Sequence, residues 1–359
     1  QFLNNMKVIT IVGARPQFIK SASVSKALQL NGYQEYVIHT GQHYDPGMST
    51  VFFEEMGLPK PYAILNCGNL KRDEMLSRMK DELKPIFDAI QPDIALVYGD
   101  TNSTLAGARM AQECKVPLVH IEAGLRSYND EMPEEHNRVE SDHIAKWLFT
   151  PTQQATENLR REGFKGRVIE QVGDVMLDAL QMFQSSAVHT EKMGPISFFQ
   201  KPFALATMHR FENISRPERL AFIVDQLNTF NDTVMPIWMP LHPATAVRLK
   251  EFGLNLTVHV APPVGYLEML WALKQTSLVL TDSGGLQKEA YYSDKPSVTL
   301  RGETEWVELI EMGASILFDP SKKELLAPKA RNILSAFKPG TKAPYGDGKA
   351  SQNIIQALV

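Results

Sequence analysis

The feature that most constrains the fold is the alternation of short apolar runs with segments of helix length. Apolar runs of four to eight residues are typical of strands buried on both faces, and strands joined by helical crossovers form parallel sheets. A helix over 16–30 is expected to end at Asn31-Gly32. The first half of the chain therefore predicts a parallel α/β domain, with strands at 7–13, 36–39, 93–98, 116–121 and 168–172.

The second half repeats this pattern, with predicted strands at 203–207, 235–239, 256–260, 278–281 and 297–300. A chain of 359 residues is long enough for two domains. We predict two Rossmann-like domains, over 6–173 and 174–348, and a helix over 349–359 that packs back on the first domain. Ligands of such sheets bind outside the carboxyl ends of the strands, so we expect the two sheets to face a central cleft.

Composition excludes several classes of protein. Hydrophobic residues make up 43% of the chain and charged residues 22%, as in ordinary globular proteins, and the formal net charge of -4 argues against nucleic-acid binding. Cys67 and Cys114 are the only cysteines, too few for a disulfide scaffold or a cysteine-based zinc site. We find neither a signal peptide nor an apolar run that could span a membrane, and expect a cytoplasmic protein.

The first predicted strand leads into a possible anion site. Gly13 permits a tight turn, Pro16 suits the first helical position, and Arg15 could reach a phosphate at the helix N-terminus. An ordinary strand-to-helix turn with a solvated arginine explains the same residues equally well.

A second helix start follows the strand at 278–281. Asp282 or Ser283 could cap this helix, and Gly284 and Gly285 would let an anion approach the backbone amides. Glu289, one turn further on, could accept hydrogen bonds from sugar hydroxyls. A well-capped structural helix is the alternative, although the pair of glycines favours phosphate binding.

Three acidic residues of the first half follow strands or begin a helix. Asp100 could be an N-cap, Glu122 a partner of Arg126, and Glu134 a first-turn carboxylate that interacts with the helix dipole. Their clustering at one edge of one sheet favours instead a site with paired acid and base.

The second domain contributes histidines in equivalent positions. His209 and Arg210 follow the strand at 203–207, and His242 follows the strand at 235–239. The nine histidines show no metal-binding spacing. The residues alone therefore predict a nucleotide- or phosphate-binding site lined with carboxylates and a histidine.

Five motifs occur in order along the chain: G-A-R-P at 13–16, Y-G-D-T-N-S at 98–103, H-I-E-A-G-L-R-S at 120–127, P-E-E-x-N-R at 133–138 and T-D-S-G-G-L-Q-K-E-A at 281–290. Together they closely resemble the non-hydrolysing UDP-N-acetylglucosamine 2-epimerase family, from Met6 almost to the C-terminus. The resemblance implies a glycosyltransferase-B-like pair of Rossmann domains, a homodimer, and catalysis without nicotinamide or metal. It also implies inversion at sugar C2 by elimination and re-addition of UDP, in the synthesis of surface polysaccharide precursors such as those of O-antigen.

The resemblance assigns roles residue by residue. The catalytic residues it implies are Asp100, Glu122, Glu134 and His209. The residues it implies for binding of UDP and sugar are Arg15, Lys20, Arg138, Arg210, His242, Ser283, Gly284, Gly285, Glu289 and Arg301. Glu212, beside the histidine, is a further candidate.

Two segments bear on the substrate. The sequences G-A-R-P-Q-F-I-K at 13–20 and T-E-W-V-E at 304–308 are more similar to enzymes that epimerise UDP-2,3-diacetamido-2,3-dideoxyglucuronate than to those acting on UDP-N-acetylglucosamine. Gln42-His43 matches part of a region where some bacterial members bind a second substrate molecule as activator, but Tyr44-Asp45 departs from that pattern.

Three alternative functions use the same pocket. A UDP-sugar-dependent glycosyltransferase of this fold would need an acceptor. A hydrolysing 2-epimerase would release UDP and N-acetylmannosamine. A catalytically silent UDP-sugar sensor would be expected to lack the acidic residues, which are all present.

Overall fold

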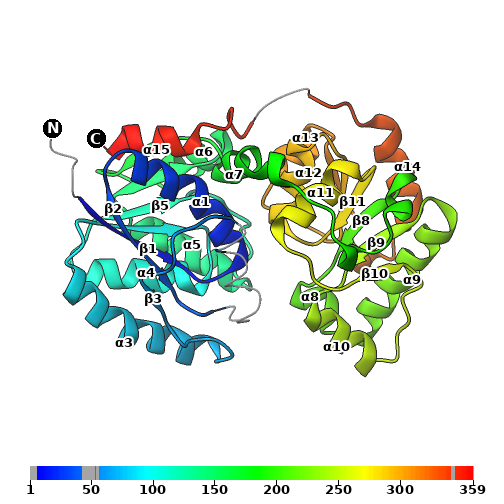
Figure 1. Cartoon of the computed structure of the whole chain (residues 1–359), viewed down its shortest axis with the longest axis horizontal. Helices are drawn as coiled ribbons and strands as arrows, with labels where there is room; N and C mark the ends of the chain where they lie inside the picture. Colours follow the sequence, from blue (N-terminus) through cyan, green and yellow to red (C-terminus); the bar gives the residue numbers. More distant parts are fainter. Residues whose placement is uncertain (1–5, 43–52, 54–55, 341–343, 359) are drawn as a thin grey trace. The chain divides into compact units, whose positions relative to one another are not determined.

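The computed structural model describes residues 6–42, 53, 56–340 and 344–358. The chain divides into two compact units (Figure 1). The first comprises Gln1–Met182 and Ala343–Val359, and the second comprises Phe183–Lys342. The predicted domain boundary lies near Gly173-Asp174, whereas the first unit continues to Met182 and includes most of the helix that begins at Val175.

The first unit is built on a parallel sheet in which described strands follow the order β3-β2-β1-β4-β5-β6-β7. Strand order reverses between β1 and β4, which is the switch point of a Rossmann-like sheet. The strands are β1 (Lys7–Val12), β2 (Gln34–His39), β3 (Ala63–Ile64), β4 (Ile94–Tyr98), β5 (Leu118–Ile121), β6 (Trp147–Thr150) and β7 (Val168–Gln171).

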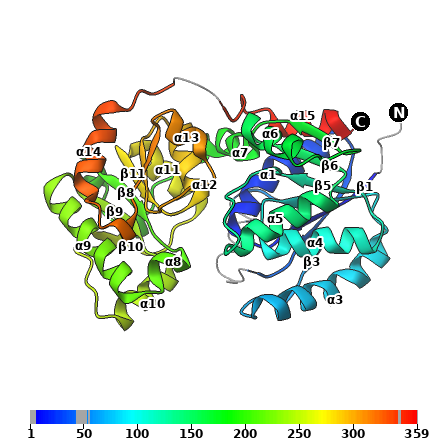
Figure 2. The same cartoon turned by 180° about the vertical axis from the view of Figure 1, so that it is seen from behind.

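Helices cover both faces of this sheet. Helices α1 and α15 lie on one face, and α3 and α4 on the other (Figures 1 and 2). On the second of these faces, Ile9 and Ile11 of β1 pack with Phe87 of α3 and Leu105 of α4 in one buried cluster. The helices are α1 (Arg15–Leu30), α3 (Arg72–Ile90), α4 (Asn102–Glu113), α5 (Pro133–Ile144), α6 (Gln153–Arg161), α7 (Val175–Phe183) and α15 (Ala350–Leu358).

The second unit repeats the arrangement with the strand order β10-β9-β8-β11-β12-β13, again all parallel. Its switch point lies between β8 and β11. The strands are β8 (Ala204–Thr207), β9 (Ile237–Pro240), β10 (His259–Ala261), β11 (Leu278–Thr281), β12 (Ser297–Thr299) and β13 (Ser315–Leu317). The α-helices are α8 (Phe211–Ile214), α9 (Pro217–Thr233), α10 (Pro243–Glu251), α11 (Tyr266–Gln275), α12 (Gly284–Tyr292), α13 (Val307–Glu311) and α14 (Leu326–Ala336).

Both faces of the second sheet are buried, as the apolar runs predicted. Leu278 and Leu280 of β11 pack in the cluster that includes α9 and α14, whereas Val279 packs with residues of α11 and α12 on the opposite face. Alternate side chains of one strand therefore enter two separate cores, which explains why the run contains no polar residue before Thr281.

The predicted α/β class is confirmed, and the main differences lie in short strands. β3, β6 and β13 were not predicted. β3 has two residues, with Ile64 54% exposed, and β13 begins with Ser315, so neither produces the continuous apolar run that marks an inner strand. The strand predicted at 256–260 is displaced toward its C-terminal end and forms β10, at the edge of the sheet.

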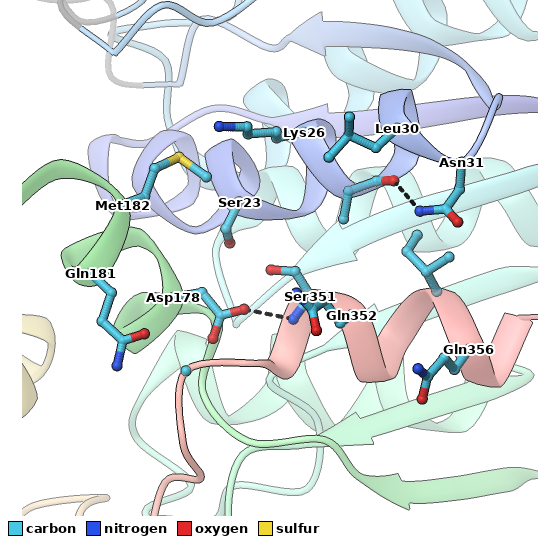
Figure 3. A pocket seen from close by; sticks show the side chains of 13 residues that line it. Ser23, Lys26, Leu30, Asn31, Asp178, Gln181, Met182, Ser351, Gln352 and Gln356 are labelled. Carbon is cyan, nitrogen blue, oxygen red and sulfur yellow. Dashed lines mark hydrogen bonds between the residues drawn. The ribbon is translucent and has the colours of Figure 1, made fainter.

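The helix at the C-terminal end of the sequence belongs to the first unit, where it packs against α1. Asp178 of α7 accepts hydrogen bonds from the backbone amides of Ala350 (3.1 Å) and Ser351 (2.7 Å), which begin α15. Between α1, α7 and α15 lies a cavity of about 630 Å³ (Figure 3). It is lined by the C-terminal half of α1, away from the helix start at Arg15. Within the described residues, no helix is both long and apolar enough to cross a membrane.

Candidate active site

The turn from β1 into α1 is fixed by a buried glutamine. The side-chain carbonyl of Gln17 accepts hydrogen bonds from the backbone amides of Gly13 (2.8 Å) and Ala14 (3.2 Å), and its amide donates to the carbonyl of Tyr98 (2.8 Å). Gln17 therefore ties the carboxyl ends of β1 and β4 together at the switch point. Arg15 begins α1 at this turn and is partly exposed.

Lys20 and Glu122 form an ion pair at this edge. The ammonium of Lys20 donates to Oε1 of Glu122 at 2.6 Å, and the two side chains are only 10% and 7% exposed. A Cβ on Gly99 would lie 3.2 Å from that carboxylate oxygen, so the absent side chain leaves room for the pair. Glu122 has a φ of 68°, in the left-handed region that costs a non-glycine residue about 1 kcal/mol or more. The partner considered from sequence, Arg126, instead pairs with Asp142 and Glu162.

Asp100 directly follows Gly99, the residue packed against this pair, and is bound by Arg138. One guanidinium nitrogen of Arg138 donates to Asp100 and another to Glu135. Arg138 is 3% exposed, whereas the side chain of Asp100 is 29% exposed. The N-cap of α4 is Thr101, so the capping role considered for Asp100 is wrong. Asp100 is thus held by a buried cation while one side remains open to a ligand.

The two adjacent glutamates of α5 differ sharply. Glu134 is exposed, and within the described residues it makes no ion pair or hydrogen bond. Glu135 is buried and accepts hydrogen bonds from the amides of Ser127 (3.0 Å) and Tyr128 (3.1 Å). Burial opposes ionisation of Glu135, but these hydrogen bonds and Arg138 outweigh it and lower its pKa. Glu135 therefore has a structural role, and Glu134 is the glutamate available to a ligand.

A further histidine, His120, was not among the predicted site residues. His120 is fully buried; its Nδ1 lies 2.7 Å from Oδ1 of Asp142, and its Nε2 lies 2.7 Å from the carbonyl of Gly99. Asp142 also accepts from the amide of Gly124 (3.2 Å). Burial opposes ionisation of Asp142, but His120 and Arg126 lower its pKa nonetheless. This network joins the loop that carries Asp100 to the loop that carries Glu122. The H-I-E-A-G motif contains His120 and Gly124, but it does not reveal this network, because Gly99 and Asp142 are distant from it in sequence.

In the second unit, Asp282 organises the carboxyl end of β8. Its fully buried carboxylate accepts hydrogen bonds from the backbone amides of His209 (3.0 Å) and Arg210 (2.9 Å), and Nδ1 of His209 lies 3.3 Å from it. The imidazole of His209 is 40% exposed, and its ring centroid lies 5.4 Å from that of His242. His242 caps α10, since its Nδ1 accepts from the amide of Ala244.

The helix start after β11 is a capped turn, as predicted. Ser283 is the N-cap of α12, and its hydroxyl accepts from the amide of Leu286 (3.4 Å). A Cβ on Gly284 would lie 2.5 Å from Oε1 of Glu305 and 3.2 Å from Nε1 of Trp306. Because Gly284 has no side chain, Glu305 and Trp306 of the 304–308 segment can pack directly against the start of α12.

Glu305 links two arginines and was not predicted. It accepts from a guanidinium nitrogen of Arg301 at 2.9 Å and lies 3.7 Å from Arg210. Arg301 is 1% exposed, and Glu212 lies 3.8 Å from its Nε. Close by, the ammonium of Lys288 lies 3.8 Å from the ring centroid of Trp306, a cation–π contact. Cationic groups are thus concentrated next to the start of α12.

The structure brings the proposed residues together in two groups, one in each unit. In the first unit these are Lys20, Asp100, Glu122 and Arg138, and in the second His209, Arg210, His242, Ser283, Gly284 and Arg301. Gly285 and Glu289 lie in α12, Glu289 being buried. Gln42 accepts from the amide (2.9 Å) and hydroxyl (2.7 Å) of Ser103, whereas His43, Tyr44 and Asp45 lie outside the described residues. In the part of the chain that is described, no group of three metal-ligating side chains is gathered.

Two parallel α/β units with charged side chains at each switch point define the class of proteins with two Rossmann-like domains, in which ligands bind outside the carboxyl ends of the strands. The fold is similar to that of a spinosyn rhamnosyltransferase (TM-score 0.57, 14% identity, 98% of this chain and 96% of that chain covered), which shows the architecture alone. The family model for UDP-N-acetylglucosamine 2-epimerase matches residues 26–359. The chain belongs to this family.

Two relatives support this assignment over their whole length. The UDP-2,3-diacetamido-2,3-dideoxy-D-glucuronate 2-epimerase of Pseudomonas aeruginosa is 47% identical over 356 residues, covering 98% of this chain and 99% of the relative. The crystal structure of Methanocaldococcus jannaschii UDP-GlcNAc 2-epimerase in complex with UDP-GlcNAc and UDP matches with a TM-score of 0.90 and 39% identity, covering 99% of both chains. The protein is accordingly a UDP-sugar 2-epimerase, which is an isomerase. The resemblance inferred from the five motifs is confirmed.

Proposed function

We propose that the enzyme inverts C2 of a UDP-2-acetamido sugar by eliminating UDP and adding it back. The observation that best supports this is the buried Lys20–Glu122 pair next to the Arg138-bound Asp100 at one edge of the first sheet. Two carboxylates, each held by a cation and each adjacent to a strand end, supply an acid and a base within a confined space.

The chemistry explains why both groups of residues are needed. The C2 proton is not acidified by a neighbouring carbonyl, so its removal becomes feasible only as the C1–O bond breaks. Departure of UDP requires stabilisation of the negative charge that develops on the diphosphate. Positive charge at Arg210 and Arg301 and the start of α12 are suited to that task. Proton transfer falls to the carboxylates of the first unit and to His209 of the second.

We assign the residues accordingly. Asp100, Glu122, Glu134 and His209 carry out proton transfer. The remaining groups bind UDP and the sugar: Arg15, Lys20, Arg138, Arg210, His242, Ser283, Gly284, Gly285, Glu289 and Arg301.

The substrate we propose is UDP-2,3-diacetamido-2,3-dideoxyglucuronate, with UDP-N-acetylglucosamine as the alternative. The Pseudomonas enzyme named for the first substrate is 47% identical to this chain. Trp306 and Val307 give this chain an apolar pair next to Arg301, where the sugar end is expected. We also propose that the enzyme works as a cytoplasmic homodimer in the synthesis of surface polysaccharide precursors.

The test is incubation with a panel of UDP-sugars in deuterium oxide, with products identified by NMR. We expect conversion without any acceptor and deuterium at C2 of the product, because the proton is removed by a side chain that exchanges with solvent. The Glu122→Gln variant serves as a control: it should bind UDP with normal affinity by calorimetry but show strongly reduced turnover.

Each alternative predicts a different spectrum. Conversion only when an acceptor is added would indicate a glycosyltransferase, and release of UDP with N-acetylmannosamine would indicate a hydrolysing 2-epimerase. Binding of every UDP-sugar without conversion would indicate a sensor. Epimerisation with hydrogen fully retained at C2 after many turnovers would refute the elimination mechanism.

A further inference from the structure

We propose that Asp282 is a positioning residue that orients His209 through Nδ1 and joins the histidine loop to the start of α12. This inference rests on the proposed function, because it assumes that His209 acts on the substrate. The residue assignments proposed above give Asp282 no role in the reaction.

The first line of support is the concentration of donors on one buried carboxylate. Asp282 is 0% exposed, and its carboxylate accepts from the backbone amides of His209 and Arg210 and from the side-chain amide of Asn213 (3.0 Å). The side chain of Asn213 also donates to the carbonyl of Leu300 (2.9 Å). The end of β8, the end of β12 and the residue after β11 are thus connected through one side chain.

The second line of support is the orientation of the imidazole. Nδ1 of His209 lies 3.3 Å from Oδ1 of Asp282. A carboxylate at that position favours a proton on Nδ1, which leaves the Nε2 lone pair of the neutral ring available to the ligand. The carboxylate is buried while the imidazole is 40% exposed, so Asp282 can influence a reacting group without touching the substrate.

The third line of support is continuity with the UDP segment. The carbonyl of Asp282 accepts from Nε of Arg210 (3.1 Å), and Asp282 directly precedes Ser283, the N-cap of α12. The turn is fixed from the other side by Thr281, whose hydroxyl accepts from the amide of Ser283 (2.9 Å) and lies 2.6 Å from the hydroxyl of Thr207. A displacement of Asp282 would therefore move the histidine and the helix start together.

If Asp282 only capped the short helix α8, it would accept the same backbone hydrogen bonds but would not determine which imidazole nitrogen carries the proton. The first measurement therefore determines the tautomer of His209 in the unmodified protein. Long-range ¹⁵N–¹H correlation NMR of the free enzyme, at a pH where His209 is neutral, reports which ring nitrogen carries the proton. We expect the Nδ1-protonated form, and a spectrum showing His209 protonated at Nε2 would overturn the proposal. This readout requires neither substrate nor turnover, so it holds even if the proposed reaction is wrong.

The second measurement uses Asp282→Asn, which keeps the size of the side chain. Asp225→Asn, an exposed aspartate of α9, is the matched control for the change in charge. We expect Asp282→Asn to lower kcat about 100-fold with a change in KM of about threefold or less, because loss of one acid–base contribution has this magnitude. The control should retain wild-type kcat.

A double-mutant cycle separates the two roles. If Asp282 acts through His209, Asp282→Asn should lower kcat much less in a His209→Ala background than in the wild type. Equal losses in both backgrounds, or wild-type kcat in Asp282→Asn, would overturn the proposal. Should Asp282→Asn fail to fold, the tautomer of the unmodified protein decides. Absence of epimerisation in the wild type would refute the proposed function but leave the tautomer result intact.

Discussion

Replacing Lys20 with methionine should destabilise the first unit by about 3 kcal/mol or more. The side chain of Glu122 is only 7% exposed, and Lys20 is the cation at 2.6 Å from it. Removing one partner of a buried ion pair typically costs about 3–5 kcal/mol, because the remaining charge stays in a poorly solvated position. Methionine preserves the length and much of the volume of lysine, so lost packing contributes little. The folded-to-unfolded ratio should fall more than about a hundredfold.

The assay must report on the first unit separately, since a two-unit chain need not unfold in one step. Hydrogen exchange at increasing urea concentration, followed by mass spectrometry of peptides from β4 and β5, gives the free energy of unfolding for these strands. Lys26→Met is the control, because Lys26 lies on the same helix but is exposed, and it should change stability by about 0.5 kcal/mol or less.

The double variant Lys20→Met/Glu122→Gln tests whether the buried charge of Glu122 causes the loss of stability in Lys20→Met. Removing both charges eliminates the buried carboxylate that Lys20 no longer neutralises, so we expect recovery of about half of the loss or more. A single Lys20→Met variant within about 1 kcal/mol of wild type would refute the argument that the pair is effectively buried. Additive losses in the double variant would show that the two side chains act independently.

Three further predictions concern the ends of the strands. Gly284→Val would place Cβ 2.5 Å from Oε1 of Glu305, so UDP binding should weaken about tenfold or more by calorimetry; normal affinity would remove this helix start from the UDP site. Glu134→Gln should leave stability within about 0.5 kcal/mol, because the side chain is exposed, yet lower kcat about 100-fold; unchanged kcat would exclude it from proton transfer. The pKa of Glu135 is lower in the folded protein than its ordinary value of 4.5, so ionised Glu135 stabilises the fold. This contribution is complete at pH values above 4.5 and is lost as pH falls through the folded-state pKa. Acid unfolding of Glu135→Gln should therefore depend less steeply on pH than that of the wild type, and equal slopes would contradict the assignment.

Most inner strands could be predicted because they are buried on both faces, whereas the four-residue inner strand β6 was not predicted. β4 and β11 contain only residues that suit a core, and both were placed within a residue of their observed bounds. The edge strands β3 and β13 are short and only partly buried, so their pairing depends on the neighbouring strand rather than on their own pattern.

In the candidate site, too, some features could be predicted from the sequence and others could not. The resemblance placed Glu122 and Lys20 among the candidate site residues, but it did not predict their pairing, because they are separated by 102 positions. Sequence proximity suggested Arg126 for Glu122, and the fold turns that guanidinium toward Asp142 instead. Local sequence specifies caps and turns such as Ser283. Buried ion pairs are formed between segments that only the tertiary fold brings together.

The first unit is discontinuous in sequence, and this has a consequence for synthesis on the ribosome. Helix α15 completes the first unit, but it follows the whole of Phe183–Lys342 along the chain. At about 5–20 residues per second, translation of that intervening stretch takes on the order of 10–30 s. During this interval the surface of α1 that α15 covers is exposed, and the carboxylate of Asp178 lacks the amides of Ala350 and Ser351. The continuous second unit can therefore reach its folded state on the ribosome before the first. The nascent first unit exposes apolar surface for longer and is the part of the chain more prone to aggregate during synthesis.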